Sequence, residues 1–154
     1  MQGVGTLCTV HRVVSLGTCL WHTAAAYYFL FRGRGILRKY FVRAAGTPHP
    51  HTVETLRFLG AINLGYALLA LISFLRSIYE RELRATDHFV LSLANFSQFV
   101  MDLIAHRNGL AQRSLLQITI PDGIFAAANV WVAFVLAYHS PRLSQIYHKS
   151  PLNE

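Results

Sequence analysis

The chain has 154 residues, of which 53% are hydrophobic and only 14% are charged, a more apolar composition than soluble domains of this length have. Its net charge is +7, but the Lys and Arg residues lie between apolar runs and form no single basic face. This distribution argues against nucleic-acid binding and favours anionic lipid headgroups as partners. The two cysteines, Cys8 and Cys19, lack the spacing of a disulfide framework or a zinc site. We therefore expect a single membrane domain, residues 1–154.

The first apolar run, residues 13–31, predicts a transmembrane helix. It stops at a basic cluster, and Tyr27 and Tyr28 near that end are typical of the aromatic belt at a membrane interface. Because the run continues past its small residues to this basic stop, we expect a helix that is not cleaved as a signal peptide. His22 lies in its middle, and a hydrogen-bonded packing histidine is expected there, with a functional histidine as the alternative.

The connection 32–57 is the most basic part of the chain, and its start has the pattern of a short helix lying on the membrane surface. Four apolar residues recur there at helical spacing, opposite basic ones: Ile36, Leu37, Tyr40 and Phe41. A plain topology signal is the alternative. The candidate headgroup contacts in this connection are Arg32, Arg34, Arg38, Lys39 and Arg43.

The second run, residues 58–75, is uncharged and lies between Arg57 and Arg76. At 1.5 Å per residue it covers roughly 27 Å, close to the hydrocarbon thickness of a bilayer, so it predicts a second span. Ala61 and Gly65 form a pair of small residues four apart, with Gly60 beside them. Such residues indicate close helix contact, either inside the bundle or with a partner.

The third run, residues 89–105, carries a polar stripe, because Asn95, Gln98 and Asp102 fall on one helical face and His106 follows one turn later. A carboxylate inside a membrane helix is costly, so Asp102 is a functional candidate by default. We expect Asn95 and Gln98 to hydrogen-bond across helices, and Asp102 to reach the interface near His106. The expected acceptors or donors for the two amides are Asn63, Asn129 and Ser73. The alternative is an acid–base pair of Asp102 and His106 in an enzyme.

The fourth run, residues 118–138, completes an all-α fold, a polytopic membrane protein with a bundle of four transmembrane helices. The stretch 121–123 (Pro-Asp-Gly) is expected to mark the interface or a broken first turn, and 139–154 is expected to be a polar tail. Four spans put both termini on one side. The dense basic connection favours a cytoplasmic location for 32–57, but the Lys and Arg count, eight against six, leaves the orientation open.

Two short motifs resemble a known family. An Arg-x-x-Gly start opens the second span at Arg57 and Gly60, and a Gln-Phe-x-x-Asp-Leu stretch at 98–103 follows about forty residues later. This is similar to the ergosterol biosynthetic protein 28 family, whose small four-span members carry an Arg-x-x-Gly start and a His-Phe-x-x-Glu-Leu-like stretch. Arg57, Gly60, Phe99 and Leu103 match, whereas Gln98 and Asp102 are substitutions in kind. The resemblance covers roughly residues 55–138.

The resemblance implies a non-catalytic scaffold of the endoplasmic reticulum that tethers sterol C4-demethylation enzymes. Independently, a compact polytopic chain without a visible cofactor motif is typical of a scaffold or accessory subunit whose partners are membrane proteins and lipids. Two alternatives remain: an accessory subunit of a mitochondrial inner-membrane complex, and a small membrane enzyme that binds a lipid or sterol and uses Asp102 and His106. The candidate helix or partner contacts are Arg57, Gly60, Asn63, Gly65, Asn95, Gln98 and Asp102.

Overall fold

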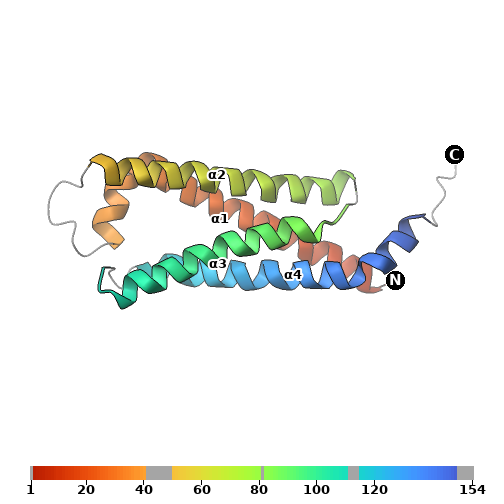
Figure 1. The fold of residues 1–154 in the computed structure, drawn as a ribbon. Helices are drawn as coiled ribbons and strands as arrows, with labels where there is room; N and C mark the ends of the chain where they lie inside the picture. The colour runs from red at the N-terminus through yellow and green to blue at the C-terminus, as the bar shows by residue number, and fades with distance from the viewer. Residues whose placement is uncertain (1, 41–49, 81, 111–114, 149–154) are drawn as a thin grey trace.

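The computed structural model describes residues 2–40, 50–80, 82–110 and 115–148. Within these ranges the chain forms four helices, and the predicted all-α fold is confirmed (Figure 1). Their bounds are α1 Gln2–Tyr40, α2 Pro50–Tyr79, α3 Ala85–Arg107 and α4 Leu116–His148. Most contacts between helices lie within two antiparallel hairpins, α1 with α2 and α3 with α4, and smaller contacts between α2 and α3 and between α1 and α4 join the hairpins.

Three of the helices are long and apolar enough to cross a membrane: α2, α3 and residues Leu116–His139 of α4. They contain the predicted spans 58–75, 89–105 and 118–138, so a membrane protein is supported. Composition does not mark α1, which contains the predicted span 13–31, as a fourth such helix. The reason is that the span carries polar residues, such as Thr18 and His22, on its buried face, and these lower its average hydropathy.

The four helices are packed with polar side chains inside and apolar side chains outside. Fully buried residues include Asn63, Asn95 and Asn129, whereas Leu20, Leu68 and other large apolar residues of every helix are exposed. The buried apolar clusters found among the described residues lie at the two ends. This arrangement is the reverse of a soluble bundle and is the one expected where the surroundings are lipid.

Helix α1 kinks at Arg32, where the backbone leaves helical geometry (φ −120°, ψ 17°). The segment after the kink runs across the end of the bundle (Figure 1). The predicted helix is confirmed. Its apolar face was expected to contact the membrane surface, but in the structure that face packs on α2 and α4. This apolar cluster consists of Ile36, Leu37, Tyr40, Val53, Leu56 and Leu115. Phe41 and Arg43 lie outside the described residues.

The start of α4 also differs from the sequence expectation. Residues 121–123 lie within the helix, which begins at Leu116, so they do not break its first turn. Pro121 lies five positions after Leu116, so α4 lacks one hydrogen bond to the carbonyl four residues earlier, yet the helix continues through it. The helix also continues to His148, beyond the predicted end of the span at 138.

The start of α1, the connection between α2 and α3, and the end of α4 lie at one end of the bundle (Figure 1). We call this the terminal end, and we call the opposite end, with the kink of α1, the loop end. In the α2–α3 connection at the terminal end, Arg84 donates hydrogen bonds of 2.9 and 3.0 Å to Glu82, and this holds the pKa of Glu82 below its usual value.

The closest approach of α1 and α2 predicts opposite effects for two glycines of one helix. A Cβ at Gly60 would lie 2.8 Å from Leu30 Cγ and 3.0 Å from the Leu30 backbone nitrogen, whereas nothing lies within 4 Å of a Cβ at Gly65. Gly60→Ala should therefore destabilise the folded protein by about 1–3 kcal/mol through overpacking. Gly65→Ala, the matched control, should be neutral or stabilising because alanine favours the helix.

The measurement is unfolding of each variant in mild detergent by denaturant titration, followed by circular dichroism. Equal stability of the two variants would contradict the close contact of Gly60 with α1.

Candidate functional site

A band of buried polar side chains runs along the interior of the bundle, and we call it the polar seam. On α1 its members recur every three or four positions and are all fully buried, so the helix turns one continuous polar face inward. The seam consists of His11, Ser15, Thr18 and His22 of α1, Asn63, Ser73 and Ser77 of α2, Asp87, His88, Ser92 and Asn95 of α3, and Thr119, Asp122 and Asn129 of α4.

Each hairpin contains one histidine–asparagine pair with the same geometry. His22 Nδ1 lies 2.7 Å from Asn63 Oδ1, and His88 Nδ1 lies 2.7 Å from Asn129 Oδ1. In both pairs the asparagine amide donates to the carbonyl four residues earlier in its own helix, at 2.9 Å. An imidazole that donates through Nδ1 fixes both side chains, so each pair joins the two helices of its hairpin. The first pair lies near the middle of α1 and α2, whereas the second joins the first turn of α3 to the middle of α4.

Each pair is also hydrogen-bonded to the other hairpin, the first as acceptor and the second as donor. Gln98 Nε2 donates to Asn63 Oδ1 at 3.5 Å, and Asn129 Nδ2 donates to Thr18 Oγ1 at 2.9 Å. Contacts between the hairpins are otherwise few. These polar bonds therefore help to hold the register of one hairpin on the other, since hydrogen bonds between helices stabilise association in lipid.

Two imidazoles meet at the terminal end of the seam. The rings of His11 and His88 lie edge to face with centroids 4.6 Å apart. His11 Nε2 lies 3.4 Å from Ser73 Oγ, and His88 Nε2 lies 3.5 Å from Ser15 Oγ. A buried apolar cluster of α1 and α4 lies beyond them, so the imidazoles sit between apolar packing and the middle of the seam.

Two carboxylates lie towards the loop end. Asp122 is almost fully buried and accepts a hydrogen bond of 2.6 Å from Trp21 Nε1. Asp102 is half-buried and accepts one of 3.1 Å from Thr119 Oγ1. Together with Gln98 they line a cavity of about 340 Å³ whose other walls are mainly apolar and come from all four helices. An apolar chamber with a few convergent polar groups is typical of a small-ligand site.

The structure separates the candidate contact residues into an inner and an outer set. Gly60, Asn63 and Asn95 are buried in the bundle, and Gln98 and Asp102 are half-buried. Arg57 and Gly65 are exposed, and Arg57 pairs with Glu54 at 2.6 Å. Whether any of them contacts a partner stays a prediction.

The hydrogen bonds of the α3 stripe match the expectations in part. Gln98 bonds to Asn63 across helices, as expected. Asn95 differs, because its amide donates to Leu91 of its own helix at 2.8 Å and its Oδ1 has no partner among the described residues. Asp102 bonds to α4 through Thr119, whereas Nε2 of the half-buried His106 has no described partner. Among the described residues, no hydrogen bond therefore joins Asp102 to His106 as an acid–base pair.

Sequence reasoning missed the pairing of the histidines, although the chain carries a signal for it. The two members of each pair are 41 positions apart, and the second pair follows the first after 66 positions. His22 was expected as a hydrogen-bonded packing residue, and that is confirmed. A search for repeated spacings of polar residues within apolar runs would also have pointed to His88 and Asn129.

In the part of the chain that the structure describes, no group of three His, Cys, Asp or Glu side chains is placed to hold a metal ion. The seam offers hydrogen-bonding groups and carboxylates in an apolar surrounding, which suits recognition of a polar group on a lipophilic molecule as well as the locking of helices. Comparison with family models, curated proteins and solved structures finds no match for this chain.

The paired geometry predicts energetic coupling between His22 and Asn63. Alanine substitutions of both should show a coupling free energy of unfolding of roughly 0.6–2 kcal/mol, because each single change already breaks their shared hydrogen bond. The cycle of His88 and Asn129 should give a similar value. Unfolding in detergent by denaturant titration measures both.

The matched control combines His22→Ala with Asn129→Ala, one residue from each pair, and should show coupling near zero. Coupling of the control cycle equal to that of the true pairs would mean that the seam acts as a diffuse polar core.

Proposed function

We propose that the chain is a non-catalytic scaffold or accessory protein with four transmembrane helices that binds other membrane proteins through its lipid-facing surface. The observation that carries this proposal is the distribution of polarity. The seam hydrogen-bonds within the chain, and the outward faces are apolar. Nearly all described residues lie in the four helices, so the surface available to a partner is largely the intramembrane one.

The proposal includes α1 as the fourth span. The outward face of α1 is apolar at Val13, Leu16, Leu20 and Phe31, and the polar residues that lower its average hydropathy are buried. A helix whose polar groups are satisfied by neighbouring helices tolerates lipid on its other side.

Four spans predict that tags at the N- and C-terminus report the same side of the membrane, whereas three spans predict opposite sides. Protease protection of terminal tags in sealed vesicles measures this. Protection of only one of the two tags would remove α1 from the membrane.

The outer face of α2 is the best candidate for a partner helix. Ala61 and Gly65 are both exposed, and they leave a shallow strip beside Leu64 and Leu68, which are also exposed. Small residues four apart let a second helix approach closely. Gly60 does not belong to this strip, because it is buried against α1.

A partner that docks on α2 should be lost when the strip is filled. Gly65→Leu should reduce co-purification of the partner in mild detergent by about tenfold or more, which corresponds to about 1.4 kcal/mol. The matched control is Gly5→Leu, since Gly5 of α1 also has nothing within 4 Å of a Cβ. Unchanged co-purification with Gly65→Leu would exclude this face as the interface.

The identity of the partners follows from the resemblance to the ergosterol biosynthetic protein 28 family, which Arg57, Gly60, Phe99 and Leu103 carry. We infer tethering of sterol C4-demethylation enzymes in the endoplasmic reticulum. Mass spectrometry of the purified complex should then find sterol-modifying oxidases, dehydrogenases or reductases in stoichiometric amounts. Respiratory-chain subunits would instead support the mitochondrial alternative, and a solitary chain would contradict the scaffold.

A second candidate function is binding of a small lipid or sterol, and the cavity beside Asp102 and Asp122 favours it. A hydroxyl or amine of a lipophilic molecule would meet two carboxylates and Gln98 there, while its apolar body would contact Phe29 and Met101. Asp102→Asn separates the two functions. A lipid-binding protein or enzyme should lose ligand or activity with this variant, whereas a scaffold should keep its partners.

A further inference from the structure

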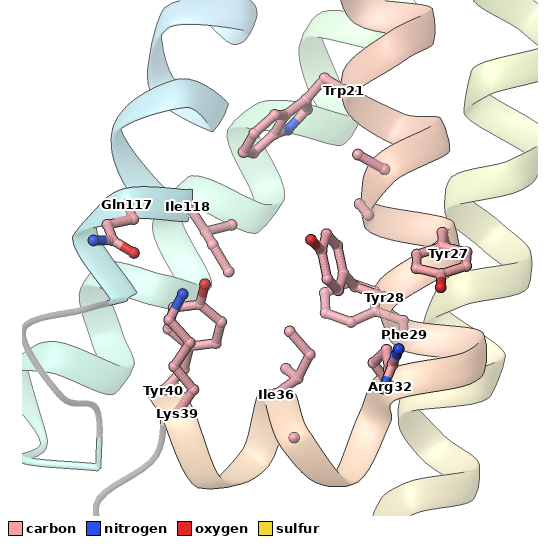
Figure 2. A pocket seen from close by; sticks show the side chains of 13 residues that line it. Trp21, Tyr27, Tyr28, Phe29, Arg32, Ile36, Lys39, Tyr40, Gln117 and Ile118 are labelled. Atoms are coloured by element: carbon pink, nitrogen blue, oxygen red, sulfur yellow. The ribbon is translucent and has the colours of Figure 1, made fainter.

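A second, larger hollow lies where α1 kinks, and we call it the kink groove. Its volume is about 690 Å³, and it lies between the two parts of α1 and the start of α4 (Figure 2). The segment after the kink forms one wall, with Ile36 between Arg32 on one side and Lys39 on the other. Gln117 and Ile118 of α4 lie opposite α1.

The charge of the kink groove is one-sided. Arg32 and Lys39 line it, and none of its described lining residues is acidic. The Lys39 ammonium lies 4.9 Å from the centre of the Tyr40 ring, and Figure 2 shows the Tyr28 hydroxyl directed into the hollow. Two cations with neighbouring hydroxyl donors match a phosphate, which accepts several charge-assisted hydrogen bonds. The amine of a zwitterionic headgroup would find no carboxylate in this lining.

The apolar part of the kink groove has the depth of one membrane leaflet. Its lining reaches along α1 from Arg32 to Trp21, which lies eleven residues earlier. At 1.5 Å per residue this is about 16 Å, roughly half of the hydrocarbon thickness of a bilayer. Between these two levels the walls are small or apolar, with Ala24, Ala25 and Phe29. A soluble anion would use only the charged end, whereas a lipid of that leaflet uses both.

We propose that the kink groove binds one anionic phospholipid, with its phosphate between Arg32 and Lys39 and one acyl chain directed towards Trp21. This site requires only that the bundle lies in a membrane, and it does not depend on the scaffold function. It also divides the basic residues of the kinked segment. Arg32 and Lys39 line the groove, whereas Arg34 and Arg38 do not.

The two tryptophans of the chain allow a local test. Trp21 lines the kink groove, and Trp131 is half exposed on α4, so Trp131→Phe leaves Trp21 as the only tryptophan reporter. The full chain with this change is reconstituted in phosphatidylcholine vesicles that contain one tenth of acyl-brominated lipid. The brominated lipid is either phosphatidylglycerol or phosphatidylcholine, and quenching of Trp21 fluorescence reports which one occupies the groove.

The expected result is a preference of about tenfold for brominated phosphatidylglycerol, the order that two basic side chains near a membrane surface supply. Arg32→Gln with Lys39→Gln should abolish the preference. The matched control, Arg34→Gln with Arg38→Gln, removes the same charge from the same segment and should keep it. Circular dichroism of each double variant checks that the helices are intact.

Two results would overturn the site. Equal quenching by the two brominated lipids would show that the groove takes membrane lipid without headgroup selection. Equal loss of the preference in both double variants would assign it to the net charge of the segment. If Arg32→Gln with Lys39→Gln lowers helix content, Gly35→Glu replaces it, because Gly35 lines the groove and has nothing within 4 Å of a Cβ. That variant should reduce the preference, and an unchanged preference would also contradict the site.

Discussion

Polar side chains in the interior of a membrane bundle must find their partners within the chain, because lipid offers none, and the packing of this protein depends on that constraint. The two histidine–asparagine pairs satisfy it within each hairpin, and they set the rotation of each helix about its axis. Once His22 and Asn63 face each other, Leu20 and Leu68 face outwards. Apolar packing alone would not choose this rotation, since leucine contacts lipid and protein with similar free energy.

The parts of the fold that could be predicted from the sequence are those where the residue types alone show whether a segment or face can contact lipid. The uncharged run 58–75 lies inside α2, and the stripe that includes Asn95 and Gln98 faces inwards because amides are costly in lipid. Helix α1 was harder to recognise as a span, since its buried polar face lowers the mean hydropathy by which transmembrane helices are recognised. The hydrogen bond between His22 and Asn63 was not predictable from either run alone, because it requires the two helices to be placed together.

The segment after Arg32 shows a different limit of sequence reasoning. The spacing of Ile36, Leu37 and Tyr40 correctly indicates a helix with one apolar face, but a period says nothing about what covers that face. Either lipid or the apolar side chains of Val53, Leu56 and Leu115 could cover it. The kink at Arg32 directs the segment across the end of the bundle, so protein and not lipid covers its apolar face. The same turn leaves Arg32 and Lys39 beside an apolar hollow and not beside bulk solvent alone.

The two histidine–asparagine pairs are offset by 66 positions, and comparing the hairpins at this offset shows which residues the hairpin geometry shares and which it does not. His22 and Asn63 correspond to His88 and Asn129, and both pairs make the same bonds, so this geometry belongs to the hairpin itself. By the same offset Asp122 corresponds to Leu56, and Asp102 corresponds to Ile36, which are members of the apolar cluster at the loop end. A hairpin of this kind therefore forms with aliphatic residues at those positions. The helix pairing itself does not require the two carboxylates. In this chain Asp122 accepts a hydrogen bond from Trp21 of the other hairpin and Asp102 accepts one from Thr119, so neighbouring helices hold both at the wall of one cavity.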